Sequence, residues 1–121
     1  MKILAVSDVE LGLLYNASVA DRFHDVDLIL SSGDLRYSYL EYLVSMLNVP
    51  LYYVLGNHAN QVEQTVAGPK RSPDGGVNLH MRFRRYEKLL MAGIEGCVQY
   101  NNGPFQYSQA EMWALAFRLV P

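Results

Sequence analysis

Three short apolar runs of this chain each end in side chains that can bind a metal ion or move a proton. The runs and the residues that follow them read ILAVSDVE, LILSSGD and LYYVLGNH. Carboxylate and amide oxygens suit divalent cations, and a neighbouring histidine can act on a phosphate ester. The candidate metal ligands are Asp8, Glu10, Asp34 and Asn57, and the candidate catalytic residue is His58. These residue types point to metal-assisted phosphate chemistry.

The apolar runs predict buried strands, and a parallel arrangement would bring their polar ends together. Residues 2–7, 27–31 and 51–55 are almost entirely apolar, as strands covered on both faces are. A short helix is expected over 15–24 and a clearer one over 36–47, where apolar residues recur at helical spacing. The order β-α-β-α-β predicts a parallel sheet with right-handed crossovers. Because ligands collect at the carboxyl ends of such strands, the polar clusters would share one site.

The middle of the chain predicts a loop and then further strands. Residues 60–76 are rich in glycine and proline, and we expect a long loop there. Two more strands are expected over 77–83 and 88–94, with a turn between them. The α/β start is therefore followed by added later strands.

The end of the chain predicts a capped helix. Residues 99–107 are aromatic and rich in turn-forming residues. Ser108 and Glu111 have the spacing of a capping box, in which each side chain bonds the backbone of the other residue. We expect a helix over 109–119 to follow.

Composition favours one globular domain and argues against two classes of partner. The chain has 121 residues, of which 50% are apolar and 18% charged, and its formal net charge is -2. Without an excess of basic residues, nucleic-acid binding is not indicated. No apolar stretch reaches the ~20 residues of a membrane helix, and the single cysteine, Cys97, excludes an internal disulfide, so we expect a cytoplasmic protein. The basic cluster Arg82, Arg84 and Arg85 is expected to form the solvated face of a strand.

The clusters resemble the motifs of the calcineurin-like metallophosphoesterases. The resemblance covers residues 1 to about 96 and rests on Asp8, Gly33-Asp34 and Gly56-Asn57-His58. It implies the N-terminal half of an α/β/β/α sandwich. It also implies that Asp8 binds one metal ion, that Asp34 bridges two ions and that Asn57 binds the second. His58 would protonate the leaving oxygen or stabilise charge on the phosphoryl group, and a water between the ions would be the nucleophile.

Two departures from the family pattern affect the metal site. The first motif, Asp-x-His in the family, reads Asp8-Val9-Glu10 here, and Ala59 replaces the acid that usually follows Asn-His. Glu10 could supply a carboxylate that favours Mn²⁺ or Mg²⁺, or it could point away from the site. The family's later Gly-His and Gly-His-x-His motifs are missing, since the only later histidine is His80, which we expect to be an ordinary strand residue.

The incomplete ligand set predicts a weakened site in an incomplete domain. The four candidate ligands favour one weakly held ion over a tight pair, with Mn²⁺ first and Mg²⁺, Fe or Zn²⁺ as alternatives. We expect residues 1–121 to form a single, truncated phosphoesterase domain that hydrolyses phosphate mono- or diesters weakly or not at all. An uncovered sheet face and edge could lead to self-association or require a partner.

Two other classes of protein would use similar acids at strand ends. A non-catalytic module could hold a metal ion or a nucleotide phosphate in the same sheet without turnover. A phospho-accepting receiver domain would need a lysine after a late parallel strand, and neither Lys70 nor Lys88 has that position. The binding module is therefore the main alternative to the enzyme.

Overall fold

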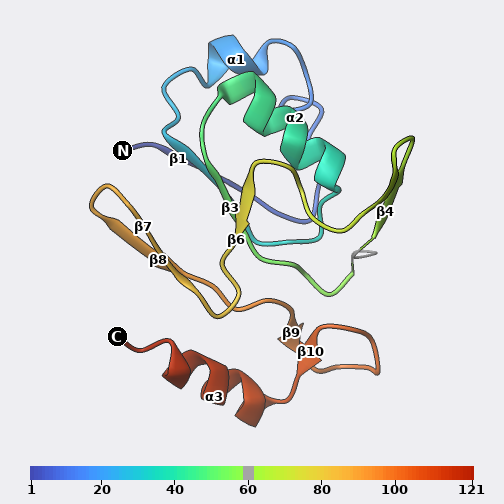
Figure 1. Ribbon diagram of the computed structural model, residues 1–121, viewed down its shortest axis with the longest axis vertical. Helices are drawn as coiled ribbons and strands as arrows, with labels where there is room; N and C mark the ends of the chain where they lie inside the picture. Colours follow the sequence, from blue (N-terminus) through green and yellow to red (C-terminus); the bar gives the residue numbers. More distant parts are fainter. Residues whose placement is uncertain (59–61) are drawn as a thin grey trace.

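The computed structural model describes residues 1–58 and 62–121. Ala59 and the start of the expected 60–76 loop lie outside the described residues. The elements shown in Figure 1 are β1 (Ile3–Val6), α1 (Val19–Arg22), β2 (Leu28–Ser31), α2 (Tyr37–Leu47), β3 (Leu51–Tyr53), β4 (Glu63–Thr65), β5 (Gly68–Lys70), β6 (Gly76–Asn78), β7 (Phe83–Tyr86), β8 (Leu89–Ala92), β9 (Cys97–Val98), β10 (Gln106–Tyr107) and α3 (Gln109–Arg118).

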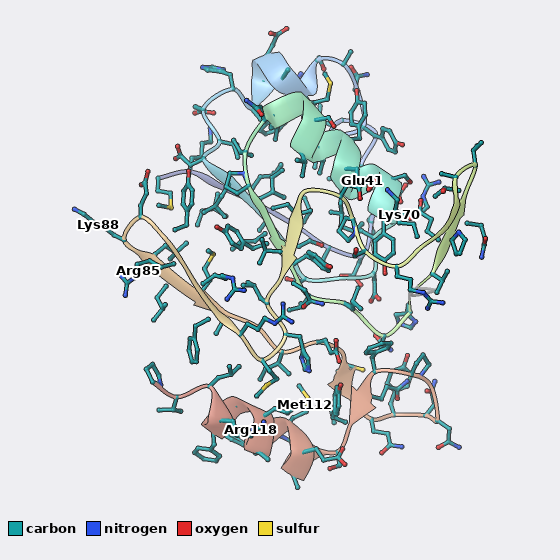
Figure 2. The ribbon with its side chains drawn as sticks, viewed as in Figure 1. Glu41, Lys70, Arg85, Lys88, Met112 and Arg118 are labelled. Carbon is teal, nitrogen blue, oxygen red and sulfur yellow. The ribbon has the colours of Figure 1, made fainter. Side chains whose placement is uncertain are left out.

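A four-stranded parallel sheet organises the first two thirds of the chain. Its strand order is β1-β2-β3-β6, and all of its strand pairs are parallel. The predicted β-α-β-α-β start and parallel sheet are confirmed. The connection from β3 to β6 differs from the expected loop, because it contains the antiparallel hairpin β4–β5. Lys70 at the end of this hairpin bonds Glu41 of α2 at 2.6 Å, so an ion pair holds the hairpin against the helix (Figure 2).

Helix α2 covers one face of the sheet and supplies most of the main core. Tyr39 and Leu43 of α2 are fully buried against Ile29 of β2 and Leu51 of β3. The helix ends at Asn48, which adopts the left-handed conformation with φ of 52° ahead of Pro50. The apolar spacing and the proline therefore define this helix as predicted.

The β7–β8 hairpin contributes to a second core. Met91 of β8 packs with Leu28 and Tyr52 of the sheet and with Leu79, and all four side chains are buried. Side chains alternate along a strand, so Leu28 and Tyr52 face away from the side that α2 covers. In Figure 1 the hairpin lies apart from α1 and α2.

The strand expected over 77–83 is not continuous. β6 joins the parallel sheet and ends at Asn78, and β7 begins at Phe83 and pairs with β8. Between them Met81 adopts the left-handed conformation with φ of 53°, and Arg82 donates a turn hydrogen bond to Leu79. This turn changes the direction of the chain between β6, which pairs with β3 in the parallel sheet, and β7, which pairs with β8 in the hairpin.

The expected burial of the first strand on both faces is wrong. β1 is the edge of the sheet in the described part of the chain, and the side chain of Ile3 remains 39% exposed. An apolar run can therefore form an edge strand, since composition alone does not fix strand order.

The C-terminal segment forms a capped but exposed helix. The Ser108 hydroxyl accepts from the Glu111 backbone at 3.1 Å, and the Glu111 carboxylate accepts from the Ser108 backbone at 2.7 Å. The predicted capping box is confirmed. No α3 residue is buried, and Trp113 and Phe117 are mostly exposed. Across the described ranges, no helix is long and apolar enough to cross a membrane.

Candidate metal and phosphate site

The ends of β1, β2 and β3 meet through direct hydrogen bonds. The Asp8 backbone N–H donates to the Gly33 carbonyl at 3.1 Å, joining the first two strand ends. The His58 backbone N–H donates to Oδ1 of Asp34 at 2.9 Å, joining the second and third. The structure therefore brings the three polar clusters together, as parallel strands predict.

Two glycines permit this close approach. A Cβ on Gly33 would lie 2.7 Å from the Gly56 Cα, and Gly33 has a φ of 105° that disfavours other residues. A Cβ on Gly56 would collide with the Asp34 carboxylate, with 2.8 Å to its Oδ2. The carboxylate thus packs directly over Gly56. Both glycines are needed for the acid to sit between the two strand ends.

The two aspartates share an uncommon backbone conformation. Asp8 has φ of 64° and Asp34 has φ of 61°, the left-handed region that only a few per cent of non-glycine residues adopt. Such conformations recur at functional sites, where the surrounding structure imposes them. Asp8 lies two residues after β1 and Asp34 three residues after β2, so these turns determine where each carboxylate leaves the sheet.

Glu10 is held by an arginine on α2's N-terminal side. Nε and Nη2 of Arg36 donate to the two carboxylate oxygens of Glu10 at 2.7 and 2.6 Å. The hydrogen bond from Arg36 lowers the pKa of Glu10, and Glu10 in turn raises the pKa of Arg36. Both carboxylate oxygens of Glu10 therefore already accept a hydrogen bond, although each keeps a second lone pair. Of the two orientations left open by the sequence, the structure has Glu10 engaged with Arg36.

Asn57 and His58 contact a tyrosine from the C-terminal segment. The Asn57 side-chain amide donates to the Tyr100 hydroxyl at 2.9 Å, and that hydroxyl lies 3.5 Å from Nε2 of His58. The sequence analysis missed Tyr100, because it lies in a turn-rich stretch with no recognisable motif. Its position between β9 and β10 could be inferred only from the fold.

A cleft of about 330 Å³ opens beside Asp34. Its lining residues are Asp34, Leu35, Arg36, Tyr37, Val62, Glu63 and Gln64. Within it, the Glu63 carboxylate accepts hydrogen bonds from the backbone of Tyr37 at 2.6 Å and of Ser38 at 3.3 Å. Glu63 therefore caps the first turn of α2 in place of a side chain from the helix itself. The volume is in the range of small-ligand sites.

The other singled-out residues have structural surroundings. His80 accepts from the Glu95 backbone N–H at 3.1 Å through Nδ1, and its Nε2 lies 3.4 Å from Oε1 of Glu95. It is half-buried and forms an isolated bridge to Gly93, in keeping with the strand-like role that we expected. The three arginines of the basic cluster are exposed, and Arg85 lies on the β7–β8 hairpin (Figure 2).

The donor set suits one hard cation better than two. In the described ranges, no group of three or more histidine, cysteine, aspartate or glutamate side chains could hold a metal ion. The oxygens of Asp8, Asp34 and Asn57 nevertheless come from three adjoining strand ends, and oxygen donors of this kind fit Mn²⁺ or Mg²⁺. These three residues are therefore the candidate ligands for a single ion, which would keep several waters.

Comparisons with known proteins yielded no relatives for this chain. No family model matches it, and neither the curated proteins nor the solved structures contain a match.

Proposed function

We propose that this chain is a metal-dependent phosphoesterase of the calcineurin-like type, with one divalent cation held by Asp8, Asp34 and Asn57. The observation that carries the proposal is the direct bonding of the three strand ends through Asp8, Gly33, Asp34 and His58. Mn²⁺ is the first candidate because the donors are oxygens. In this proposal the parallel sheet corresponds to the N-terminal half of an α/β/β/α sandwich.

In this proposal the cation, His58 and Asp34 have different roles in ester hydrolysis. When bound, the ion supplies Lewis acidity to a phosphoryl oxygen and makes water a better nucleophile. His58 is next to the ligand Asn57 and is exposed, so its ring can reach the leaving oxygen of a bound ester and donate a proton to it. Asp34 fixes the backbone of His58 through the 2.9 Å hydrogen bond, which would hold this residue at the strand end where the cation would bind. The substrates are phosphate mono- or diesters.

One observation favours a second candidate, a binding module without turnover. Arg36 binds both carboxylate oxygens of Glu10, so this fourth candidate ligand already has a partner that competes with a cation. A cation with few protein ligands binds weakly, and weak binding lowers the fraction of chains that are ready for catalysis. We therefore expect low activity, and the module differs from the enzyme only in the chemical step.

The decisive experiment measures metal binding and hydrolysis in the same preparations. Calorimetry with Mn²⁺ is combined with assays on p-nitrophenyl phosphate and its bis ester, for the parent chain and Asp34→Asn. Asp21→Asn, an exposed acid on α1, is the matched control. We expect at least about a tenfold loss of binding and turnover in Asp34→Asn only.

The possible results separate the candidates. Metal-dependent turnover that Asp34→Asn loses supports the enzyme. Mn²⁺ binding at Asp34 with no turnover supports the binding module. A parent chain that binds no Mn²⁺, or an Asp34→Asn variant that behaves like Asp21→Asn, contradicts both.

A further inference from the structure

We propose that Tyr100 is a positioning residue of this site, which orients the Asn57 amide and the His58 ring. It approaches from the connection between β9 and β10, far along the chain from both residues. Its hydroxyl accepts from Nδ2 of Asn57 at 2.9 Å and lies 3.5 Å from Nε2 of His58. The rings of His58 and Tyr100 are also neighbours, with centroids 6.4 Å apart. One hydroxyl thus contacts both side chains of the third polar cluster.

The hydrogen bond to Tyr100 determines which end of the Asn57 amide is available to a cation. An asparagine side chain carries donors on nitrogen and an acceptor oxygen on the other branch of the same planar group. Because the nitrogen of Asn57 faces the hydroxyl, the oxygen is left for another partner. Only this oxygen can bind a metal ion. The same hydroxyl lies 3.5 Å from Nε2 of His58, so it contacts the histidine ring while it accepts from Asn57.

The loop that carries Tyr100 is built by its own hydrogen bonds. Oε1 of Gln106 accepts from the backbone of Tyr100 at 3.0 Å and of Asn101 at 3.1 Å. Oδ1 of Asn101 accepts from Gln106 at 2.6 Å and from the Gly103 backbone at 2.8 Å. A loop with this many internal bonds loses little conformational freedom when it presents a side chain.

A backbone hydrogen bond just before β9 anchors the segment that leads into this loop beside the third strand end. The Gly96 N–H donates to the Leu55 carbonyl at 2.8 Å, immediately before Gly56 and Asn57 in the sequence. The anchor and the Tyr100 contact thus lie at the same strand end. Although Tyr100 is 61% exposed, its hydroxyl makes a specific contact. We infer a role in holding the ligand geometry, since an exposed ring adds little to core stability.

The test removes only the hydroxyl, in Tyr100→Phe. The inference rests on the proposed function for its metal readout, so a second readout is independent of metal. The Asn57 side-chain amide protons are followed by NMR without metal, and Mn²⁺ affinity is measured by calorimetry. We expect the amide proton that faces Tyr100 to shift and exchange faster, and Mn²⁺ affinity to fall on the order of tenfold.

Two further variants make the result specific. Tyr86→Phe removes a hydroxyl from the β7–β8 hairpin and should change neither readout. Gln106→Ala keeps the Tyr100 hydroxyl but releases its backbone, and should move both readouts in the direction of Tyr100→Phe. The melting temperature of each variant shows whether the chain remains folded.

Each outcome decides the inference. Both readouts changed in Tyr100→Phe, with Tyr86→Phe unaltered, supports it. An unchanged Asn57 amide signal overturns it, and so does a changed signal with parental Mn²⁺ affinity. If the parent chain binds no Mn²⁺, the proposed function fails, and the amide signal alone decides whether Tyr100 orients Asn57.

Discussion

The sheet body and the C-terminal segment of this protein are stabilised in different ways. The body comprises β1, β2, β3 and β6 with α1 and α2, and among the residues that the structure describes it contains the largest fully buried side chains. The C-terminal segment comprises β9, β10 and α3, and its helix buries no residue. In Figure 1 this segment lies at the opposite end of the molecule from α1 and α2. Tertiary burial dominates the first region, and local hydrogen bonds dominate the second.

The difference shows that a helix can satisfy every local signal and still depend little on the core. Helix α3 has a complete capping box, yet its Trp113 side chain is 57% exposed and its Phe117 side chain 68% exposed. Helices of about ten residues are marginal on their own, because tertiary packing normally provides most of their stability. Tyr100 lies in the loop between β9 and β10, and α3, which buries no residue, follows β10. The loop that supplies Tyr100 to the candidate site thus adjoins a helix with little tertiary packing.

The largest effect is expected when the same substitution, leucine to alanine, is made in each of the two regions. Leu43 in α2 is fully buried, whereas Leu115 in α3 is half-buried. We expect Leu43→Ala to lower the free energy of unfolding by about 2–5 kcal/mol, since it removes packed methyl groups and leaves a cavity. Leu115→Ala should cost about 1 kcal/mol or less. Urea unfolding monitored by far-UV circular dichroism measures both.

Equal losses in the two variants would contradict the comparison. They would mean that α3 packs into the cooperative core as tightly as α2 does. A separate transition at low urea, seen by Trp113 fluorescence together with a partial loss of the helical circular dichroism signal, would support the comparison by showing that the C-terminal segment unfolds first.

A smaller effect is expected at the α3 cap. Ser108→Ala removes the hydroxyl that accepts from the Glu111 backbone, which should cost about 1 kcal/mol of helix stability. Because α3 contributes no buried residue, the loss should stay local. Hydrogen exchange should quicken over 109–118 and remain unchanged in α2. Ser45→Ala, an exposed position within α2, is the control, and faster exchange in both helices of the Ser108→Ala variant would contradict the prediction.

Much of the sheet body could be predicted because its signals are local. The apolar runs identified three strands, and the spacing within 36–47 identified α2. Strand order was not encoded in the same way, so the exposed edge position of β1 was missed. The break at Met81 was missed as well, because its left-handed turn follows from pairing Phe83–Tyr86 with a different partner.

The candidate site was predictable only where residues lie in the turns that follow the strands. Asp8, Asp34 and His58 lie two to five residues beyond β1, β2 and β3, and hydrogen bonds join these turns. The partners of Glu10 and Asn57 could not be deduced, since Arg36 and Tyr100 approach from other elements. Sequence spacing predicts where a side chain leaves the sheet, but the tertiary fold determines which residues form hydrogen bonds with it.

The smallest effect concerns the ion pair at the rim of the sheet body. If burial rather than charge stabilises the body, Glu10→Gln should lower the free energy of unfolding by only about 0.2–1 kcal/mol at neutral pH. Arg36 lowers the pKa of Glu10 below its ordinary value of 4.5, so the contribution is present above that pH. It is lost as the pH falls through the lower, folded-state value. The stability difference between the parent chain and Glu10→Gln should therefore be constant from pH 6 to 8 and vanish in acid.

Thermal unfolding at a series of pH values measures this difference, with Glu87→Gln at the exposed tip of the β7–β8 hairpin as the control. High salt should reduce the effect of Glu10→Gln, because the Arg36 side chain is 63% exposed. A loss of several kcal/mol that persists in acid would contradict the prediction, since it would require a packing role for the Glu10 side chain.

Glu10→Gln also tests whether Glu10 is a metal ligand. If Glu10 stays paired with Arg36, the substitution should leave the Mn²⁺ affinity of the chain nearly unchanged. A large fall in that affinity would mean that Glu10 leaves Arg36 to join Asp8 and Asp34 at the ion.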